Sequence, residues 1–271
     1  MRDLRVSISQ MDILWEDEVG NRDKIFQDIK SVSGKTDLLV FPEMFNTGFS
    51  MNPENLYSGT ADLVSDLKNW ASEFKVAVCG SLIFKEGDDF YNRFVFISPS
   101  GGYAQYDKRH LFSYADEEKH FVAGNEKLII NWNDWKICPM ICYDLRFPAF
   151  ARNSILGSEA QYDVLIYVAN WPARRATAWK SLLKARSIEN IAYVLGANRS
   201  GSDGNNIDYV GDSVVHNPLG IEILNMGAEE LIETVSLSKE YLIESRNRFS
   251  FLNDADSYEI KGASVRHIDL A

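Results

Sequence analysis

The chain has 271 residues, of which 45% are hydrophobic and 25% are charged, and its formal net charge is −11. This length suits one large α/β domain or two small ones, and the composition is typical of a soluble globular protein. An acidic surface repels phosphate backbones, so the charge argues against a nucleic-acid partner.

The hydropathy pattern and the cysteine count indicate the compartment. No stretch approaches the ~18 apolar residues of a membrane span, so we expect no membrane association. Residues 1–6 lack the apolar run of a signal peptide. Three cysteines, an odd number, do not make a disulfide framework. These features together predict a cytoplasmic protein in which a cysteine remains a free thiol.

In the first half of the chain, strands are predicted to alternate with helices. Strands show either alternating apolar residues or short apolar runs, whereas helices repeat apolar residues every three or four positions. Thr60 is expected to cap a helix whose apolar stripe begins at Leu63 and Leu67. The predicted elements are a strand over Leu4–Gln10, a helix over 19–32, a buried strand over 37–41, the helix from Thr60 to Phe74, and a hairpin of strands 76–84 and 92–98.

In the second half, hairpins are predicted to be more frequent. The helix over 176–192 is expected to turn Trp179, Leu183 and Ile188 inward, and the last 25 or so residues are predicted to form a short helix and an irregular tail. Residues 101–107 lead into a polar stretch that ends at Gly124. The other predicted elements are strands over 128–132, Trp135–Ile141, 163–168, 193–197, 209–216, 221–225 and 231–236, and a short helix over 150–156. The sum is a fold of mixed sheets with helices outside, in one continuous domain over 1–271 with a core at about 4–240.

Three reactive side chains each follow an apolar, strand-like run. Glu43 lies among apolar neighbours, which should raise its pKa and suit a general base. Lys108 could supply a positive charge to a developing oxyanion. Cys142 ends the run 137–141, where a strand could present a thiol nucleophile. Taken singly, each has an ordinary alternative: a capping glutamate, a surface lysine or a packing cysteine.

Other catalytic and cofactor sites find less support in the sequence. Of the four histidines, His110, His120, His216 and His267, none is recognisable at a strand end with an orienting Asn or Asp, although composition alone allows a Cys–His pair. Cys138 and Cys142 lack a matching Cys/His pair at a zinc-like distance, so no metal site is expected. No phosphate-binding glycine motif is present, so no nucleotide cofactor is expected.

The order of these residues resembles the nitrilase superfamily of carbon–nitrogen hydrolases. The resemblance extends over about residues 4–240. Its blocks in chain order are Phe41-Pro42-Glu43, Tyr106-Asp107-Lys108-Arg109-His110-Leu111, Ile141-Cys142-Tyr143-Asp144-Leu145-Arg146-Phe147-Pro148, Ala169-Asn170-Trp171-Pro172, Ala185-Arg186-Ser187-Ile188-Glu189-Asn190, and Gly211-Asp212-Ser213 before Asn217-Pro218. One block would be weak evidence, whereas six in the same order are specific.

The resemblance implies a four-layer α-β-β-α sandwich, usually paired into a homodimer or larger homo-oligomer, that needs no metal or organic cofactor. It also implies a Glu-Lys-Cys triad, carried here onto Glu43, Lys108 and Cys142. Glu117 matches the place of the family's second glutamate, and Glu118 is the alternative because the loop alignment can slip by one. The backbone N–H of Tyr143 would help Lys108 to hold the oxyanion of a thioester-forming amide hydrolysis. Asp144 and Arg146 are expected to brace the turn rather than touch substrate.

Within the superfamily, the blocks look most like the ω-amidase branch, which hydrolyses 2-oxoglutaramate and 2-oxosuccinamate. These small substrates carry a carboxylate remote from the amide, and a guanidinium binds a carboxylate well. Arg174 and Arg175 are the candidates, although either could instead cover the surface or pair with acids at an interface. The other candidate substrate-binding residues are Asn170, Trp171, Phe45 and Phe112. Two alternatives stay open: another amidase or N-carbamoyl hydrolase of the superfamily, and a non-catalytic binding module on the same fold.

Overall fold

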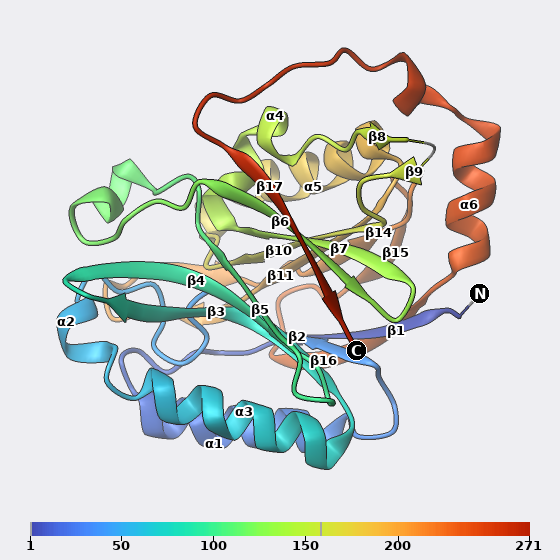
Figure 1. Ribbon diagram of the computed structural model, residues 1–271. Coiled ribbons are helices and arrows are strands. Elements are labelled where there is room, and N and C mark those ends of the chain that lie inside the picture. Colours follow the sequence, from blue (N-terminus) through green and yellow to red (C-terminus); the bar gives the residue numbers. More distant parts are fainter. Residues whose placement is uncertain (1, 158) are drawn as a thin grey trace.

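The computed structural model describes residues 2–157 and 159–271. Two mixed β-sheets face each other, and helices cover their outer sides (Figure 1). The helices are α1 (Glu18–Ser31), α2 (Pro53–Leu56), α3 (Thr60–Phe74), α4 (Pro148–Ala151), α5 (Ala176–Asn190) and α6 (Lys239–Arg248). This arrangement is the four-layer α-β-β-α sandwich that the resemblance implied.

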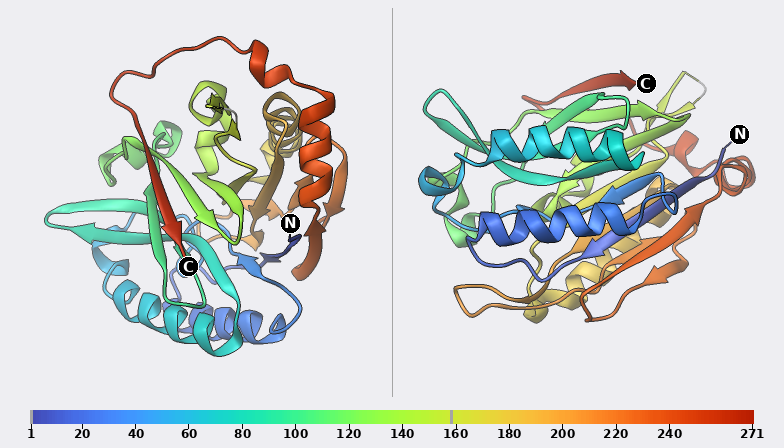
Figure 2. Two further views of the ribbon diagram at one scale, coloured as in Figure 1. Left: turned by 45° about the vertical axis from the view of Figure 1, so that its right-hand side comes forward. Right: turned by 90° about the horizontal axis from the view of Figure 1, so that it is seen from below.

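The first sheet has the strand order β16-β1-β2-β3-β4-β5. β1 pairs parallel with β2 and antiparallel with β16, and β3 and β4 form the predicted hairpin. Its outer face is covered by α1 and α3, which lie side by side in Figure 2. The strands are β1 (Leu4–Gln10), β2 (Leu38–Val40), β3 (Ala77–Glu86), β4 (Asp89–Ile97), β5 (Tyr103–Asp107) and β16 (Leu231–Leu237).

The second sheet has the order β15-β14-β11-β10-β7-β6-β17. β10 pairs parallel with both β7 and β11, and α4 and α5 lie outside the sheet with α6 beside them (Figure 1). The strands are β6 (Glu126–Trp132), β7 (Trp135–Ile141), β10 (Val164–Ala169), β11 (Tyr193–Asn198), β14 (Val214–His216), β15 (Glu222–Asn225) and β17 (Ser264–Leu270). Two short hairpins lie outside the sheets: β8 (Ile155–Leu156) with β9 (Glu159–Ala160), and β12 (Ser200–Ser202) with β13 (Asp208–Val210).

The core explains why the run at 37–41 is apolar throughout. Leu38 and Val40 face the cluster between the two sheets, whereas Leu39 faces the cluster beneath α1 and α3. Because both faces of this strand are buried, its sequence does not alternate between apolar and polar residues.

Several predicted elements are wrong in detail. The expected helix over 150–156 ends at Ala151 and is followed by the short strand β8. The single strand over 209–216 is two strands, because Gly211 and Asp212 both have positive φ angles and break the run. The irregular tail contains β17, which adds to the edge of the second sheet beside β6.

Two side chains also differ from expectation. Thr60 is the first residue of α3 rather than its cap, and its hydroxyl donates to the carbonyl of Ile83 at 2.8 Å. Ile188 does not face inward, because 47% of it is exposed on α5. Helical spacing locates an apolar stripe, but it does not show where the covering layer ends.

Candidate active site

The ends of four strands bring polar side chains together between the two sheets. Glu43 follows β2 and Lys108 follows β5 in the first sheet, whereas Cys142 follows β7 and Asn170 follows β10 in the second. Glu43 and Lys108 are fully buried. The backbone N–H of Asn170 donates to Glu43 Oε2 at 2.9 Å, which joins the two sheets at this point.

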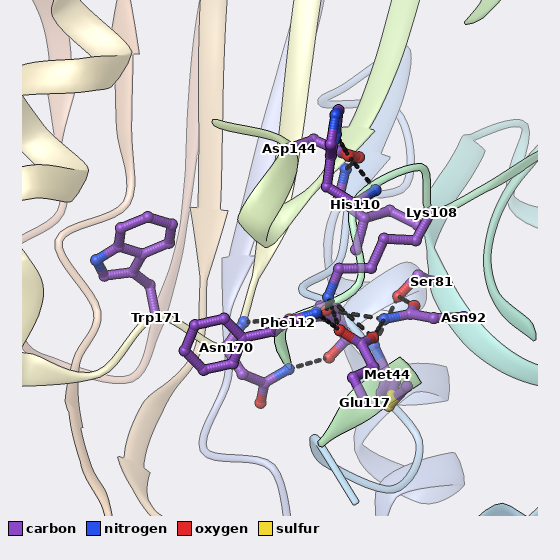
Figure 3. A network of polar contacts seen from close by, with 12 residues as sticks. Met44, Ser81, Asn92, Lys108, His110, Phe112, Glu117, Asp144, Asn170 and Trp171 are labelled. Atoms are coloured by element: carbon purple, nitrogen blue, oxygen red, sulfur yellow. Dashed lines mark hydrogen bonds and ion pairs between the residues drawn. The ribbon is translucent and has the colours of Figure 1, made fainter. Parts of the chain in front are cut away.

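An ion network fixes the lysine (Figure 3). Lys108 Nζ lies 2.8 Å from Glu43 Oε1 and 3.0 and 2.8 Å from the two carboxylate oxygens of Glu117. Asn92 donates from Nδ2 to Glu43 Oε1 at 2.8 Å and to Glu117 Oε1 at 3.1 Å, and its Oδ1 accepts from Ser81. Glu117 is fully buried, whereas Glu118 is exposed, so the geometry favours Glu117 over its neighbour.

The charges of this network follow from burial and pairing. Burial lowers the pKa of Lys108, but the carboxylates of Glu117 and Glu43 outweigh burial, so the net pKa lies above its usual value. Burial raises the pKa of Glu117, and the Lys108 ammonium offsets only part of this rise. Lys108 therefore stays cationic at neutral pH and can serve as a fixed positive charge.

Cys142 lies at a sharp strand-to-helix turn. Its φ is 43°, and it begins the short 3₁₀ helix Cys142–Arg146 (η3). Left-handed backbone in a non-glycine residue is costly and is concentrated at functional sites. Burial raises the pKa of the thiol, and the nearby carboxylate of Glu43 raises it further. The resting group is therefore a thiol, and a base must remove its proton.

Asp144 braces this turn, as expected. Its Oδ2 accepts the backbone N–H of Ile141 at 2.9 Å and the Tyr106 hydroxyl at 2.7 Å, and its side chain is fully buried. Its Oδ1 lies 2.8 Å from His110 Nδ1. The expectation that no histidine has an orienting acid is wrong for His110, because Asp144 is distant in sequence and reaches it only in the folded chain.

A cavity of about 440 Å³ opens beside the thiol. Of the predicted substrate-binding residues, it brings together Asn170, Trp171, Arg174, Arg175 and Phe112 with Cys142 and Tyr143. Residues that the sequence reasoning missed also line it: Trp15, Glu16, Phe49, Ser50, Met51, Tyr114, Ala115, Arg146, Pro172, Asp203, Asn205, Ile207 and Tyr209.

Phe45 does not line the cavity, and its predicted role as a wall is wrong. It is fully buried in the cluster beneath α1 and α3, with its ring stacked on Phe41 at 4.8 Å. The intervening Met44 has a φ of 44°, so the chain turns sharply between Glu43 and Phe45. Proximity in sequence to a buried carboxylate was therefore a poor guide to what Phe45 touches.

Arginines from two elements lie around the cavity. Arg146 stacks on Trp171, Arg174 on Tyr114 and Arg175 on Phe112, with guanidinium-to-ring distances of 5.0, 5.9 and 5.2 Å. Burial lowers the pKa of Arg175, and the neighbouring charges of Arg174 and Arg146 lower it further. Arg146, which was expected to brace the turn, also lines the cavity. The arginines form a cationic wall.

Some of the missed residues carried a signal in the sequence. Asn92 alternates with Phe94 and Phe96, whose side chains face the core between the sheets, so a polar residue in that register is a buried one. Asp203 and Asn205 belong to the loop between β12 and β13, and no pattern connects that loop with residue 142. Among the described residues, no group of three or more His, Cys, Asp and Glu side chains is arranged to hold a metal ion.

No helix within 2–157 or 159–271 has both the length and the apolarity needed to cross a membrane.

Comparison with known proteins identifies the family. The chain is 39% identical to the omega-amidase YafV of Escherichia coli over 96% of this chain and 100% of that protein. It is 32% identical to the 2-oxoglutaramate amidase of Bacillus subtilis over 92% of this chain and 96% of that protein.

The solved structure of XC1258 from Xanthomonas campestris, a CN-hydrolase superfamily protein with an arsenic adduct in its active site, superposes with a TM-score of 0.93 at 38% identity. The match covers 96% of this chain and 100% of that one. The carbon–nitrogen hydrolase family model matches residues 5–247. The chain therefore belongs to the carbon–nitrogen hydrolase family.

Proposed function

We propose that this protein is an ω-amidase. It hydrolyses the terminal amide of a small carboxylate-bearing substrate, of the 2-oxoglutaramate or 2-oxosuccinamate type, to a carboxylate and ammonia. The observation that carries the proposal is one cavity lined by the thiol of Cys142 and by three arginines, with a buried Glu-Lys-Glu network next to the thiol. The relatives named omega-amidase and 2-oxoglutaramate amidase, which match nearly the whole chain, support the same substrate class.

The first half of the reaction forms a thioester. Glu43 takes the proton from Cys142 Sγ as the sulfur attacks the amide carbon, which suits a thiol whose pKa is raised. The oxyanion that develops is held by Lys108 Nζ and the backbone N–H of Tyr143. Tyr143 is the second residue of η3, where N–H groups lack partners within the helix. Glu43 then gives its proton to the nitrogen, the C–N bond breaks, and ammonia leaves.

The second half of the reaction releases the acid. Glu43, again a carboxylate, takes a proton from water as the water oxygen attacks the thioester carbon. The same oxyanion donors act again, the C–S bond breaks, and the proton returns to Cys142. Glu117 holds Lys108 in place with two oxygens within 3.0 Å of Nζ and can accept an N–H of the substrate amide. No step of this sequence requires a metal or an organic cofactor.

The cationic wall would bind the remote carboxylate. A guanidinium pairs with a carboxylate through two parallel hydrogen bonds. Arg174 and Arg175 are the predicted partners, and Arg146 is a third candidate because it lies four residues after Cys142 and lines the same cavity. Asn170, Trp171 and Phe112 line the same cavity, and the rings of Trp171 and Phe112 pack against Arg146 and Arg175.

An ammonia-release assay over a substrate panel tests this function. We expect the highest kcat/KM for 2-oxoglutaramate and 2-oxosuccinamate, lower values for neutral amides, and none for nitriles. Preferential release of ammonia from N-carbamoyl amino acids would favour a carbamoyl hydrolase of the same family. The Cys142→Ala variant should abolish hydrolysis with its circular dichroism spectrum unchanged, and full activity in this variant would remove the thiol from the mechanism.

A non-catalytic binding module on the same fold is the remaining alternative. It is disfavoured because the thiol lies beside a network that joins both glutamates to the lysine. Intact mass after treatment with an amide electrophile should show one adduct on wild-type protein and none on Cys142→Ala. We further expect a homodimer or larger homo-oligomer in the cytoplasm.

A further inference from the structure

We propose that His110 is a positioning residue for the nucleophile. Its hydrogen bonds to Asp144 connect the segment that carries Lys108 with the turn that carries Cys142. They thereby fix the position of the thiol relative to the lysine that stabilises the oxyanion. The inference rests on the proposed hydrolysis at Cys142, and His110 takes no direct part in that chemistry. It is not among the residues that line the cavity.

One carboxylate oxygen receives two donors from His110. Its backbone N–H and its Nδ1 lie 3.0 and 2.8 Å from Asp144 Oδ1 (Figure 3). A carboxylate only accepts hydrogen bonds, so Nδ1 carries the proton in this contact. Because His110 lies two residues after Lys108, the bond connects the exit of β5 to the turn that follows β7.

The other carboxylate oxygen of Asp144 accepts hydrogen bonds from residues of both sheets. Asp144 Oδ2 accepts the Ile141 N–H, directly before the thiol, and the Tyr106 hydroxyl, directly before the Lys108 segment. Asp144 therefore bridges the two sheets through four donors, of which His110 supplies two. Without the ring donor, one side of a fully buried carboxylate would keep only a backbone partner.

Aromatic packing holds the imidazole in this orientation. The His110 ring stacks on Phe147 with a centroid distance of 3.9 Å and an interplanar angle of 9°, and it meets the edge of Phe150 at 5.5 Å. Both phenylalanines follow Cys142 in the chain, at the end of η3 and in α4. The ring is therefore fixed against the same turn by packing as well as by hydrogen bonds.

Positioning predicts an effect on kcat rather than on KM. A displacement of about 1 Å at a reacting group can cost about 10²-fold in rate even when binding is intact. His110→Phe keeps an aromatic ring for the stack but removes the donor, so we expect kcat to fall by about 10²-fold with KM unchanged. His110→Asn places an amide N–H near the position of Nδ1, so it should restore most of kcat.

The experiment compares these two variants with wild-type protein and with His267→Phe, a control on the exposed face of β17. The kinetic constants are expressed per folded molecule, with the folded fraction measured by circular dichroism, so that unfolded protein is not counted. A fall in kcat for His110→Phe that His110→Asn reverses supports positioning. Equal losses in both variants, a rise in KM that accounts for the loss, or an unchanged kcat per folded molecule would overturn it.

A second measurement separates this proposal from the proposed function. The rate of Cys142 alkylation depends on the setting of the thiol but not on the identity of the substrate. If wild-type protein releases no ammonia from any ω-amide, the substrate proposal fails, and slower alkylation in His110→Phe would still support positioning. Alkylation at the wild-type rate in that variant would overturn the role of His110 regardless of substrate.

Discussion

At the scale of single residues, left-handed backbone accompanies the reactive groups. Met44, Asp116 and Cys142 all have positive φ angles. Met44 directly follows Glu43, Asp116 directly precedes Glu117, and Cys142 carries the thiol. In each place the chain must leave a strand or loop abruptly to direct a polar side chain into the space between the sheets. Such conformations cost on the order of 1–3 kcal/mol each and persist where the surrounding structure holds them.

The role of Glu43 can be tested with an isosteric change. Glu43→Gln keeps the shape and the contact with Asn170 N–H but cannot take a proton from the thiol. We expect kcat to fall by about 10²–10⁴-fold, the usual contribution of a general base. Ammonia release gives the rate, and thermal unfolding serves as the control for fold. A variant with wild-type kcat would show that Glu43 is not the base.

The cationic wall gives a second prediction at this scale. Arg174→Ala should raise KM for ω-amides that carry a carboxylate by about 10- to 100-fold, because a charge-assisted hydrogen bond contributes about 1.5–3 kcal/mol. Neutral amides should be affected much less, and Arg248→Ala on the exposed side of α6 is the matched control. Equal changes for charged and neutral amides would remove the proposed role, and the same comparison applies to Arg146 and Arg175.

At the scale of elements, the C-terminal segment completes the second sheet. β17 pairs in parallel with β6 over its whole length, and Ile268 and Leu270 pack against the core. The backbone carbonyl of Ala271 accepts from Ser98 at 3.1 Å, which ties the chain end to the first sheet. The final strand therefore covers an edge that would otherwise be open.

Removal of residues 264–271 tests the importance of this strand. The truncated chain loses two half-buried apolar side chains and the hydrogen bonds to β6, so we expect a loss of about 2–4 kcal/mol in the free energy of unfolding. Urea unfolding measures it, and the catalytic rate at low temperature should be retained, since no residue of β17 lines the cavity. An unchanged free energy of unfolding would show that the pairing of β17 with β6 does not stabilise the fold.

Asp163 links α6 to the second sheet. Its carboxylate pairs with Lys239 and Arg246 of α6, both at 2.7 Å. Burial raises the pKa of Asp163, but these two cations outweigh burial, so its pKa in the folded protein lies below the usual value of about 3.9.

A depressed carboxyl pKa contributes stability that is present above the unfolded-state pKa and is lost as the pH falls through the folded-state value. Asp163→Asn should therefore lower the free energy of unfolding by about 3 kcal/mol at pH 7 and by less at pH 3. Chemical unfolding at both pH values measures the difference. A destabilisation of equal size at both would assign the effect to packing instead of charge.

At the scale of the whole molecule, the two sheets share one core. The cluster between them draws on Val6 and Phe96 from the first sheet and on Ile130 and Val168 from the second. A shared core predicts one cooperative unfolding transition over 1–271, which differential scanning calorimetry would show as a single peak. Two resolved peaks would indicate that the sheets unfold separately.

An exposed apolar area bears on the predicted homo-oligomer. Ile188 of α5 lies against Gly220, and Leu219 and Ile221 beside that glycine are also exposed. Exposed apolar patches of this kind frequently mark protein contacts. Ile188→Glu should shift the sedimentation coefficient toward that of a monomer of 30.8 kDa. An unchanged sedimentation coefficient would place the subunit contact elsewhere, and a monomeric wild type would contradict the predicted oligomer.

The amino-acid sequence alone determined the elements whose signal is local. Alternation and helical spacing predicted β1, α3 and the β3–β4 hairpin, and the order of motifs identified the family and therefore the four-layer fold. Glu43, Lys108 and Cys142 could be singled out because each follows an apolar run, and the structure places Glu43 and Lys108 in one network beside the thiol.

Only the tertiary structure decided the contacts that connect distant segments. Whether Phe45 walls the cavity, whether Arg146 lines it and which acid orients His110 depend on turns with left-handed residues and on loops from both sheets. The sequence did not predict β17, because an edge strand with one exposed face has a weak apolar period. Its partner is also distant in the chain: Asn131 of β6, which donates a hydrogen bond to Asp269 of β17, lies 138 residues earlier. Local periodicity reports which face of an element is covered, but it carries no information about which distant residue covers it.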